Sequence, residues 1–299
     1  MSIKSILALT DFSTAAEHAL ERAALIAARH QAKLRLIYGA EVANLGFSDP
    51  FARLQQRGRQ LARRHAITVE AVDHAGDMLD EVVKHAGRAN LLVLDHRRHR
   101  VLQVFWRGTT LDQLMRRCQC PVLIVKQAPS ARYGRILVAV EFTAESEKLV
   151  RYASSFEDES ELELFHCFEP SNNAGLSAKM GTVEMMTASL RAALPDTQSR
   201  SLRLSDSFDT RRNRVMSLAG RGEPAREIAV HQDFVRADLV IVGRNRNSTA
   251  VDFLFGNVAR RFINWVNNDV LVVPHDYQAT SVAVAKERIQ TLLNGVRLI

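Results

Sequence analysis

Cysteine is scarce in this chain, and its scarcity excludes a fold stabilised by disulfides. The 299 residues include three cysteines, Cys118, Cys120 and Cys167, an odd number with no framework of spaced pairs. Cys118 and Cys120 are too close together, and too isolated from other such pairs, to predict a zinc site. We interpret Cys118 and Cys120 as structural thiols.

Long apolar runs are absent as well. No stretch approaches the roughly 18 apolar residues that a membrane-spanning helix requires, and the first apolar run, residues 6–10, is only as long as a strand and stops at Asp11. We therefore expect a cytoplasmic protein with no membrane span.

Signatures of catalysis are also missing. The chain contains no Walker A sequence, no nucleophile elbow, no HExxH sequence and no pair of carboxylates in a context that would supply an acid and a base. It also lacks the Ser-Gly-Gly loop and the His-x-Gly-His sequence of enzymes that adenylate their substrates. We predict that the protein is not an enzyme.

Positive charge is plentiful and unevenly distributed. Residues 4–132 contain 20 Lys and Arg against 12 Asp and Glu, a net of +8, whereas the remainder has a net of −1. Five arginines fall on one expected helix: Arg53, Arg57, Arg59, Arg63 and Arg64. Such a surface can be a solvated helix face, or it can bind nucleic acid, anionic lipid or phosphate-rich ligands. Because no aromatic residues are interleaved with these charges, we do not expect nucleic acid.

A second basic cluster, residues 96–100, contains His96 and His99 at a spacing that could suit a metal ion. A loop this basic repels cations, so we expect no metal there.

What the chain does contain is an internal repeat. Residues 89–126 align without a gap to residues 237–274, and residues 6–13 align to residues 136–143. Repeats of this length are whole domains rather than solenoid units, and the chain length also suggests two domains. We predict one domain at residues 1–130, a second at residues 135–275, and a tail at residues 276–299 with a helix over 282–293.

Each half alternates strands and helices, which predicts a parallel sheet with helices on both faces. Strands are expected at residues 6–10, 33–38, 68–72, 91–94 and 122–125, and at 136–140, 162–168, 215–218, 239–242 and 270–273. Helices are expected at residues 14–30, 50–66, 78–87 and 110–117, and from 145, at 225–234 and at 258–267. Thr14 and Glu17 can form a capping box that begins the first helix.

Four short motifs stand out in the sequence, and their order and spacing are found in both halves. They are residues 9–13 (LTDFS), 222–224 (GEP), 237–243 (ADLVIVG) and 253–259 (FLFGNVA). Together they resemble the universal stress proteins in their tandem-domain form, over the whole chain up to Pro274. The second half is most similar to the C-terminal domain of the E-type members.

The resemblance implies a fold class. It is α/β, with two tandem doubly wound parallel-sheet domains that are adenine nucleotide alpha hydrolase-like, with strand order 3-2-1-4-5. In this family the last strands pair with each other, which implies an internal pseudo-dimer of the two domains. A further homodimer of the whole chain is compatible with this arrangement.

The resemblance also implies where a nucleotide would bind. Many members hold ATP with a loop after the fourth strand that reads G-x2-G-x9-G-[ST], in which glycines let the backbone approach phosphate at a helix N-terminus. The matching positions in the second half are Gly243, Arg246, Gly256 and Asn257, followed by Val258, and those in the first half are Asp95, Arg98, Gly108 and Thr109. The carboxylate of Asp95 would repel a triphosphate. Arg246 could block the backbone or contact phosphate.

Residues after the first and second strands match the adenine side of the family site. They are Asp11 and Gly39 in the first half, and Glu141 and Cys167 in the second. Asp11 can equally cap the first helix, because an acidic residue there is favoured in any case. We interpret His166 as a histidine of the core or its rim.

Two hypotheses for function therefore remain for a stress-response protein. In the first, the second domain binds ATP or another adenine nucleotide. In the second, neither domain binds a nucleotide, and the chain is a scaffold that works through surfaces such as the basic face of the first domain. Weak ATP hydrolysis with Asp252 holding a metal ion is a less favoured third.

Overall fold

The computed structural model divides the chain into two compact units. Unit 1 comprises Met1–Arg132 and Asp276–Ile299, and unit 2 comprises Tyr133–His275. The structure describes residues 3–39, 49–74, 77–96, 110–129, 132–141, 144–168, 215–221, 223–244 and 262–277.

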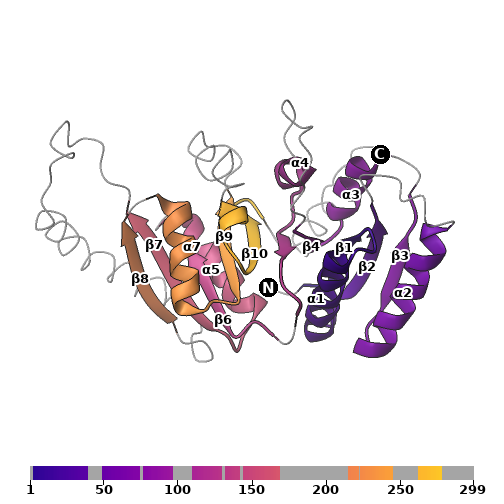
Figure 1. The fold of residues 1–299 in the computed structure, drawn as a ribbon, viewed down its shortest axis with the longest axis horizontal. Helices are drawn as coiled ribbons and strands as arrows, with labels where there is room; N and C mark the ends of the chain where they lie inside the picture. Colours follow the sequence, from indigo (N-terminus) through magenta and orange to yellow (C-terminus); the bar gives the residue numbers. More distant parts are fainter. Residues whose placement is uncertain are drawn as a thin grey trace, which may run out of the picture. The chain divides into compact units, whose positions relative to one another are not determined.

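Unit 1 is built on five parallel strands in the order β3-β2-β1-β4-β5 (Figure 1). Its strands are β1 (Ser5–Thr10), β2 (Lys33–Tyr38), β3 (Val69–Val72), β4 (Leu91–Asp95) and β5 (Val122–Val125). Its helices are α1 (Thr14–His30), α2 (Pro50–His65), α3 (Met78–Ala86) and α4 (Thr110–Arg117).

Unit 2 repeats this arrangement with its strands in the order β8-β7-β6-β9-β10, all parallel. Its strands are β6 (Arg135–Ala139), β7 (Glu161–Phe168), β8 (Val215–Arg221), β9 (Leu239–Arg244) and β10 (Asp269–Pro274), and its helices include α5 (Ala144–Phe156) and α7 (Pro224–Val235). Residues 262–265 are also helical. The predicted strand order, 3-2-1-4-5, is confirmed in each unit.

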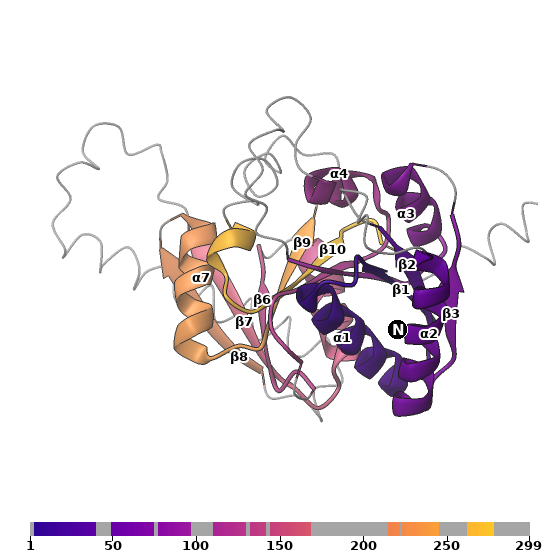
Figure 2. The ribbon, with the colours of Figure 1, turned by 45° about the vertical axis from the view of Figure 1, so that its right-hand side comes forward.

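Helices cover both faces of each sheet, so the strands form the core. In unit 1, α1 and α2 contact each other on one face, while α3 and α4 contact each other on the opposite face (Figure 2). In unit 2, α5 packs against β6 and β9, and α7 packs against β7 and β8. Every residue of β4 and β5 is buried, as expected for parallel strands covered on both sides.

The first helix has the predicted bounds, Thr14–His30, but it is capped differently from our prediction. Its N-cap is Ser13, whose hydroxyl accepts a hydrogen bond from the N–H of Ala16 at 3.2 Å. Thr14 is therefore the first helical residue, and the predicted capping box of Thr14 and Glu17 is wrong. The cap shifts by one residue because Asp11 turns the chain just before it, accepting a hydrogen bond from the N–H of Ser13 at 2.9 Å.

The chain rejoins unit 1 at the amino edge of its sheet, where the strands begin. The hydroxyl of Tyr277 donates to the carbonyl of Asn90 at 3.2 Å, and burial raises the pKa of that hydroxyl. The side-chain oxygen of Asn90 in turn accepts from the N–H groups of Lys4 and Ser5. The predicted tail helix, residues 282–293, lies outside the described residues.

All three cysteines are free thiols, and Cys118 and Cys120 are buried. Across the part of the chain that the structure describes, no helix has the length and apolar character to cross a membrane.

Candidate functional site

The candidate site of each unit lies where its strand order reverses. In unit 2, β6 and β9 are neighbours, and the chain continues from β6 toward β7 on one side and from β9 toward β10 on the other. Ligands of open parallel sheets bind outside the carboxyl ends of the strands at such a point. The residues at these strand ends are Glu141, after β6, and Gly243, near the end of β9, in unit 2. In unit 1 they are Asp11, after β1, and Asp95, the last residue of β4.

In unit 1 the turn after β1 is held by its own side chains. Thr10 is fully buried, and its hydroxyl accepts from the N–H of Phe12 at 3.0 Å, while Asp11 binds the N–H of Ser13. Phe12 has a φ of 65°, a left-handed conformation that is uncommon outside glycine. The N-capping role that we considered for Asp11 is therefore wrong, because the cap is Ser13; the carboxylate of Asp11 holds the turn just before the cap instead.

The ring of Phe12 lies between two other side chains from different elements. It stacks on Tyr38 at the end of β2 with centroids 5.1 Å apart, and the guanidinium of Arg53 on α2 lies 4.6 Å from its centroid. A cation over an aromatic ring is a favourable electrostatic contact. These two contacts join the turn after β1 to the end of β2 and to α2.

Gly39 follows β2, and its Cα is covered by apolar side chains. Its N–H donates to the carbonyl of Thr10 at 2.9 Å. A Cβ atom on Gly39 would lie 2.7 Å from Cδ1 of Leu9 and 2.9 Å from Cγ of Met78. A ligand atom could take the Cβ position of this glycine only if Leu9 and Met78 moved.

His74 follows β3, close to the same strand ends. Its Nε2 is 2.6 Å from the carbonyl oxygen of Tyr38, and its buried Nδ1 has no hydrogen-bond partner among the described residues. Asp95, at the end of β4, is buried with 6% of its surface exposed. Gly108 and Thr109 lie outside the described residues.

In unit 2, Glu141 follows β6, and Cys167 lies near the end of the adjacent strand β7. Glu141 is exposed, and its N–H donates to the hydroxyl of Ser146 in the first turn of α5 at 3.2 Å. Cys167 is half-buried on β7. Beside it, Nδ1 of His166 lies 2.8 Å from the carbonyl oxygen of Val140, so His166 is a half-buried histidine at the rim that is hydrogen-bonded to backbone.

Gly243 lies near the end of β9, and the imidazole of His275 lies directly over it. The next residue, Arg244, is buried, and its carbonyl accepts from the N–H of His275 at 2.8 Å. Arg246, Gly256, Asn257, Val258 and Asp252 lie outside the described residues, so their roles stay predictions. The described residues contain no group of His, Cys, Asp or Glu that could hold a metal ion.

A model of one family matches the chain twice. It is the universal stress protein family, and the matches cover residues 2–126 and 132–274. The chain belongs to this family.

Solved structures agree with the fold of a tandem universal stress protein. One from Archaeoglobus fulgidus DSM 4304 is 15% identical with a TM-score of 0.65, and covers 91% of this chain and 97% of its own. A protein of unknown function from Pseudomonas aeruginosa PAO1 is 20% identical with a TM-score of 0.61, and the match covers 91% of this chain and 92% of that protein.

A universal stress protein in complex with cAMP is 20% identical with a TM-score of 0.34, and covers 49% of this chain and 100% of its own. The search of curated proteins found no match.

The structure adds three residues that our sequence analysis of this universal stress protein missed. They are His275 over Gly243, and Leu9 and Met78 against Gly39. The sequence could have indicated His275, because this residue immediately follows the second copy of the repeat, which we ended at Pro274. Nothing in the sequence indicates that Met78, at the start of α3, reaches the end of β2.

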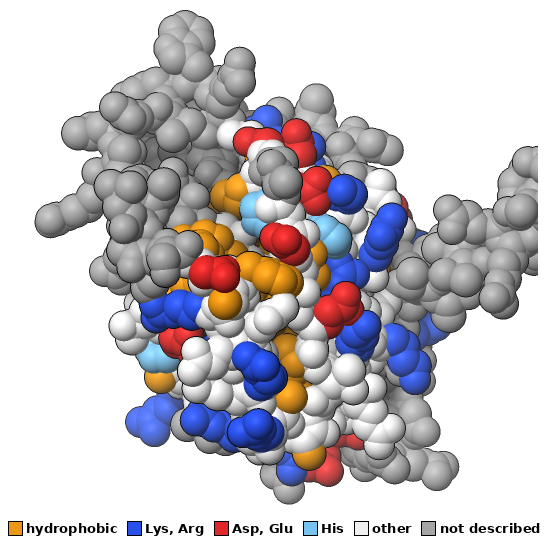
Figure 3. Space-filling model, turned by 90° about the vertical axis from the view of Figure 1, so that its right-hand side faces the viewer, with side chains coloured by type: hydrophobic (Ala, Val, Ile, Leu, Met, Phe, Trp, Pro, Cys, Tyr) orange, Lys and Arg blue, Asp and Glu red, His pale blue; other side chains and the backbone are white. Residues whose placement is uncertain are grey.

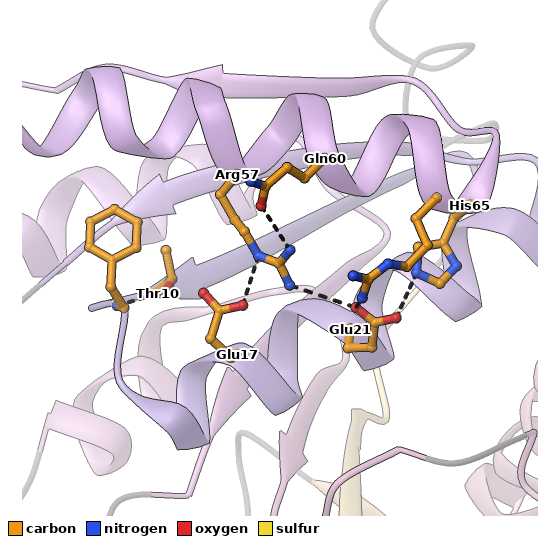
Figure 4. Close-up of polar contacts among 8 residues, drawn as sticks. Thr10, Glu17, Glu21, Arg57, Gln60 and His65 are labelled. Carbon is orange, nitrogen blue, oxygen red and sulfur yellow. Dashed lines mark hydrogen bonds and ion pairs between the residues drawn. The ribbon is translucent and has the colours of Figure 1, made fainter.

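One side of the basic helix α2 pairs with acidic side chains of α1. The other side, which we call the open side, carries exposed arginines. Toward α1, Arg57 Nε lies 2.7 Å from a carboxylate oxygen of Glu17, and Nε2 of His65 lies 2.8 Å from Glu21 (Figure 4). Arg64 also reaches Glu21, at 3.3 Å.

The open side of α2 carries Arg59 and Arg63. Both are exposed, and neither has an acidic partner among the described residues. Figure 3 shows Lys and Arg side chains spread over the visible side of the molecule, with acidic side chains interspersed among them.

Proposed function

We propose that this universal stress protein is a non-catalytic stress-response protein that binds an adenine nucleotide at the carboxyl edge of unit 2. The observation that carries the proposal is the reversal of strand order between β6 and β9, with Glu141 and Gly243 at the two strand ends. A carboxylate at one end can accept hydrogen bonds from amino or hydroxyl groups of a nucleoside. A glycine at the other end is suited to phosphate.

Unit 1 supports binding less well, for two reasons. A buried carboxylate, that of Asp95, stands at the position that corresponds to Gly243, and it would repel phosphate. Leu9 and Met78 also cover the Cα of Gly39. We therefore assign the nucleotide to unit 2 alone.

Calorimetric titration of the nucleotide-stripped full chain with ATP and ADP tests this assignment. We expect saturable binding to one site per chain. Glu141→Gln should weaken binding by about 10- to 100-fold, since a hydrogen bond to a charged group contributes about 1.5–3 kcal/mol. Asp11→Asn, the matched change in unit 1, should leave the affinity unchanged. No heat and no thermal stabilisation at millimolar nucleotide would exclude the proposal.

A second candidate function is that of an interaction protein, and the open side of α2 favours it. The helix has no acidic residue within Pro50–His65, and its apolar residues, Leu54 and Leu61, are buried. Two exposed arginines one turn apart, Arg59 and Arg63, fit an acidic protein surface, because each guanidinium can bind a carboxylate in a bidentate manner.

Charge reversal tests this second candidate. Arg59→Glu with Arg63→Glu should abolish capture of partner proteins from stressed cells, in a manner sensitive to salt. The control is Arg226→Glu with Arg236→Glu, which changes the charge equally on exposed positions of unit 2. Equal capture by both double variants would exclude a role for the α2 face.

A further inference from the structure

The space in front of Gly243 is filled by one side chain, that of His275. A Cβ atom built on Gly243 would overlap Nε2 of the imidazole, and would lie 2.9 Å from its Cδ2 and 3.4 Å from its Cε1. These three ring atoms are the nearest neighbours of such a Cβ. The imidazole therefore occupies the volume that the missing side chain of residue 243 leaves empty.

The position of His275 follows from the pairing of β9 with β10. Pro274 pairs with Arg244 in the parallel register, and the next N–H, that of His275, donates to the carbonyl of Arg244 at 2.8 Å. The backbone of His275 is thus tied to the end of β9. Its side chain reaches back over the preceding residue of β9, which is Gly243.

Unit 1 fills the equivalent space in another way. Leu91 pairs with Ile6 and Leu239 pairs with Ile136 at matching positions of the two halves, which makes Asp95 the counterpart of Gly243. There the buried side chain of residue 95 itself takes the space. In unit 2 the residue is a glycine, and the imidazole of His275, which follows β10, occupies that space instead.

A glycine at a strand end helps to bind phosphate only if the phosphate can approach its backbone closely. The phosphate and the imidazole of His275 cannot occupy the same volume. We propose that His275 sets the nucleotide affinity of unit 2 by competing with the phosphate groups for the space over Gly243. This inference rests on the proposed nucleotide site.

The test is titration of ATP and of adenosine into the full chain carrying His275→Ala or His275→Phe. We expect ATP to bind the alanine variant about three- to tenfold more tightly, since displacing one ordered side chain has a cost of that size. The phenylalanine variant keeps a ring in place and should bind no more tightly than the wild type. Adenosine has no phosphate, so its affinity should not differ between wild type and the alanine variant.

A matched control is Gln127→Ala, at the position of unit 1 that corresponds to His275, which should leave ATP affinity unchanged. Melting of each variant without ligand confirms folding, and His275→Ser replaces the alanine variant if that variant is unfolded.

Equal or weaker binding of ATP by the alanine variant would overturn the role of His275 while leaving the nucleotide site in place. Binding by the alanine variant but not by the wild type would support the role of His275 and would show that the resting chain is closed. Absence of binding in every variant would overturn the nucleotide site itself, and this inference with it.

Discussion

His85, on α3, is held beside a permanent positive charge. Its Nδ1 lies 2.8 Å from a guanidinium nitrogen of Arg35 on β2, so this nitrogen accepts a hydrogen bond and the ring is neutral. Burial, and then the charge of Arg35, lower the pKa of His85 below its usual value of 6.5. Glu81, 3.5 Å from Nε2, opposes this shift only in part.

The lowered pKa predicts a loss of stability in acid. As the pH falls through 6.5, the unfolded chain takes up a proton at His85 that the folded chain still excludes, so the free energy of unfolding decreases. Above that pH the contribution of the neutral ring is complete. When urea unfolding is measured between pH 7 and pH 5, the free energy of unfolding of His85→Gln should depend less on pH than that of the wild type. The difference in slope should be up to about 1.4 kcal/mol per pH unit.

Arg35→Gln provides the companion measurement for His85. It removes the guanidinium that disfavours the protonated ring, so it should also reduce the dependence of stability on pH. If stability depended on pH in both variants as it does in the wild type, neither residue would influence the uptake of protons by the folded chain.

Gly39 and Gly87 differ in the space around them, which predicts opposite effects of alanine. A Cβ at Gly39 would lie within 3.0 Å of Leu9 and Met78, whereas at Gly87 the nearest atom, a backbone oxygen, would be 3.4 Å away. Gly39→Ala should destabilise unit 1 by about 1–3 kcal/mol through overpacking.

Gly87→Ala should be neutral, or should stabilise by about 0.4–1 kcal/mol, because its φ of −60° suits any residue. Midpoints of urea unfolding decide the comparison. Equal midpoints for the two variants would contradict the packing at Gly39.

At the scale of elements, the start of α1 is decided by one hydroxyl. Ser13 is the N-cap, and Thr14 follows it inside the helix. Ser13→Ala should therefore cost about 0.5–2 kcal/mol in thermal or urea unfolding, the usual cost of losing such a cap. Thr14→Ala is the matched control and should be close to neutral. The reverse result would restore the capping box that the sequence suggested.

The pairing of α1 with α2 explains which charges of unit 1 remain available to a partner. Glu17 and Glu21 on α1 engage Arg57, Arg64 and His65 on α2. Neither the charge count nor the helical pattern of α2 could reveal this division, because the carboxylates come from a helix about 40 residues earlier.

At the scale of the molecule, each unit contributes five parallel strands, and the last strand of each is apolar. In unit 1 this strand is β5, Val122–Val125, next to β4. Residues 1–132 expressed alone should therefore dimerise or precipitate, because an apolar edge strand presents unpaired backbone groups. Light scattering after size-exclusion chromatography measures this, and a monodisperse monomer at high concentration would contradict the predicted pairing of last strands in the full chain.

The sequence by itself determined the repeat, the family and the fold of each unit. It did so because strands buried on both faces must be continuously apolar, as residues 122–125 are, and because the two halves repeat the same order. Strand ends were less well predicted. β9 continues through Gly243 and Arg244 since backbone pairing with β10 does not require apolar side chains.

Only the tertiary structure decided what surrounds the candidate site residues. Asp11 and Gly39 matched family positions by sequence, yet one holds a turn and the other is covered by Leu9 and Met78. His275 lies over Gly243 although 32 residues separate them in the chain. A motif specifies which backbone atoms a ligand could meet, whereas the volume in front of them depends on side chains that only the pairing of distant strands brings together.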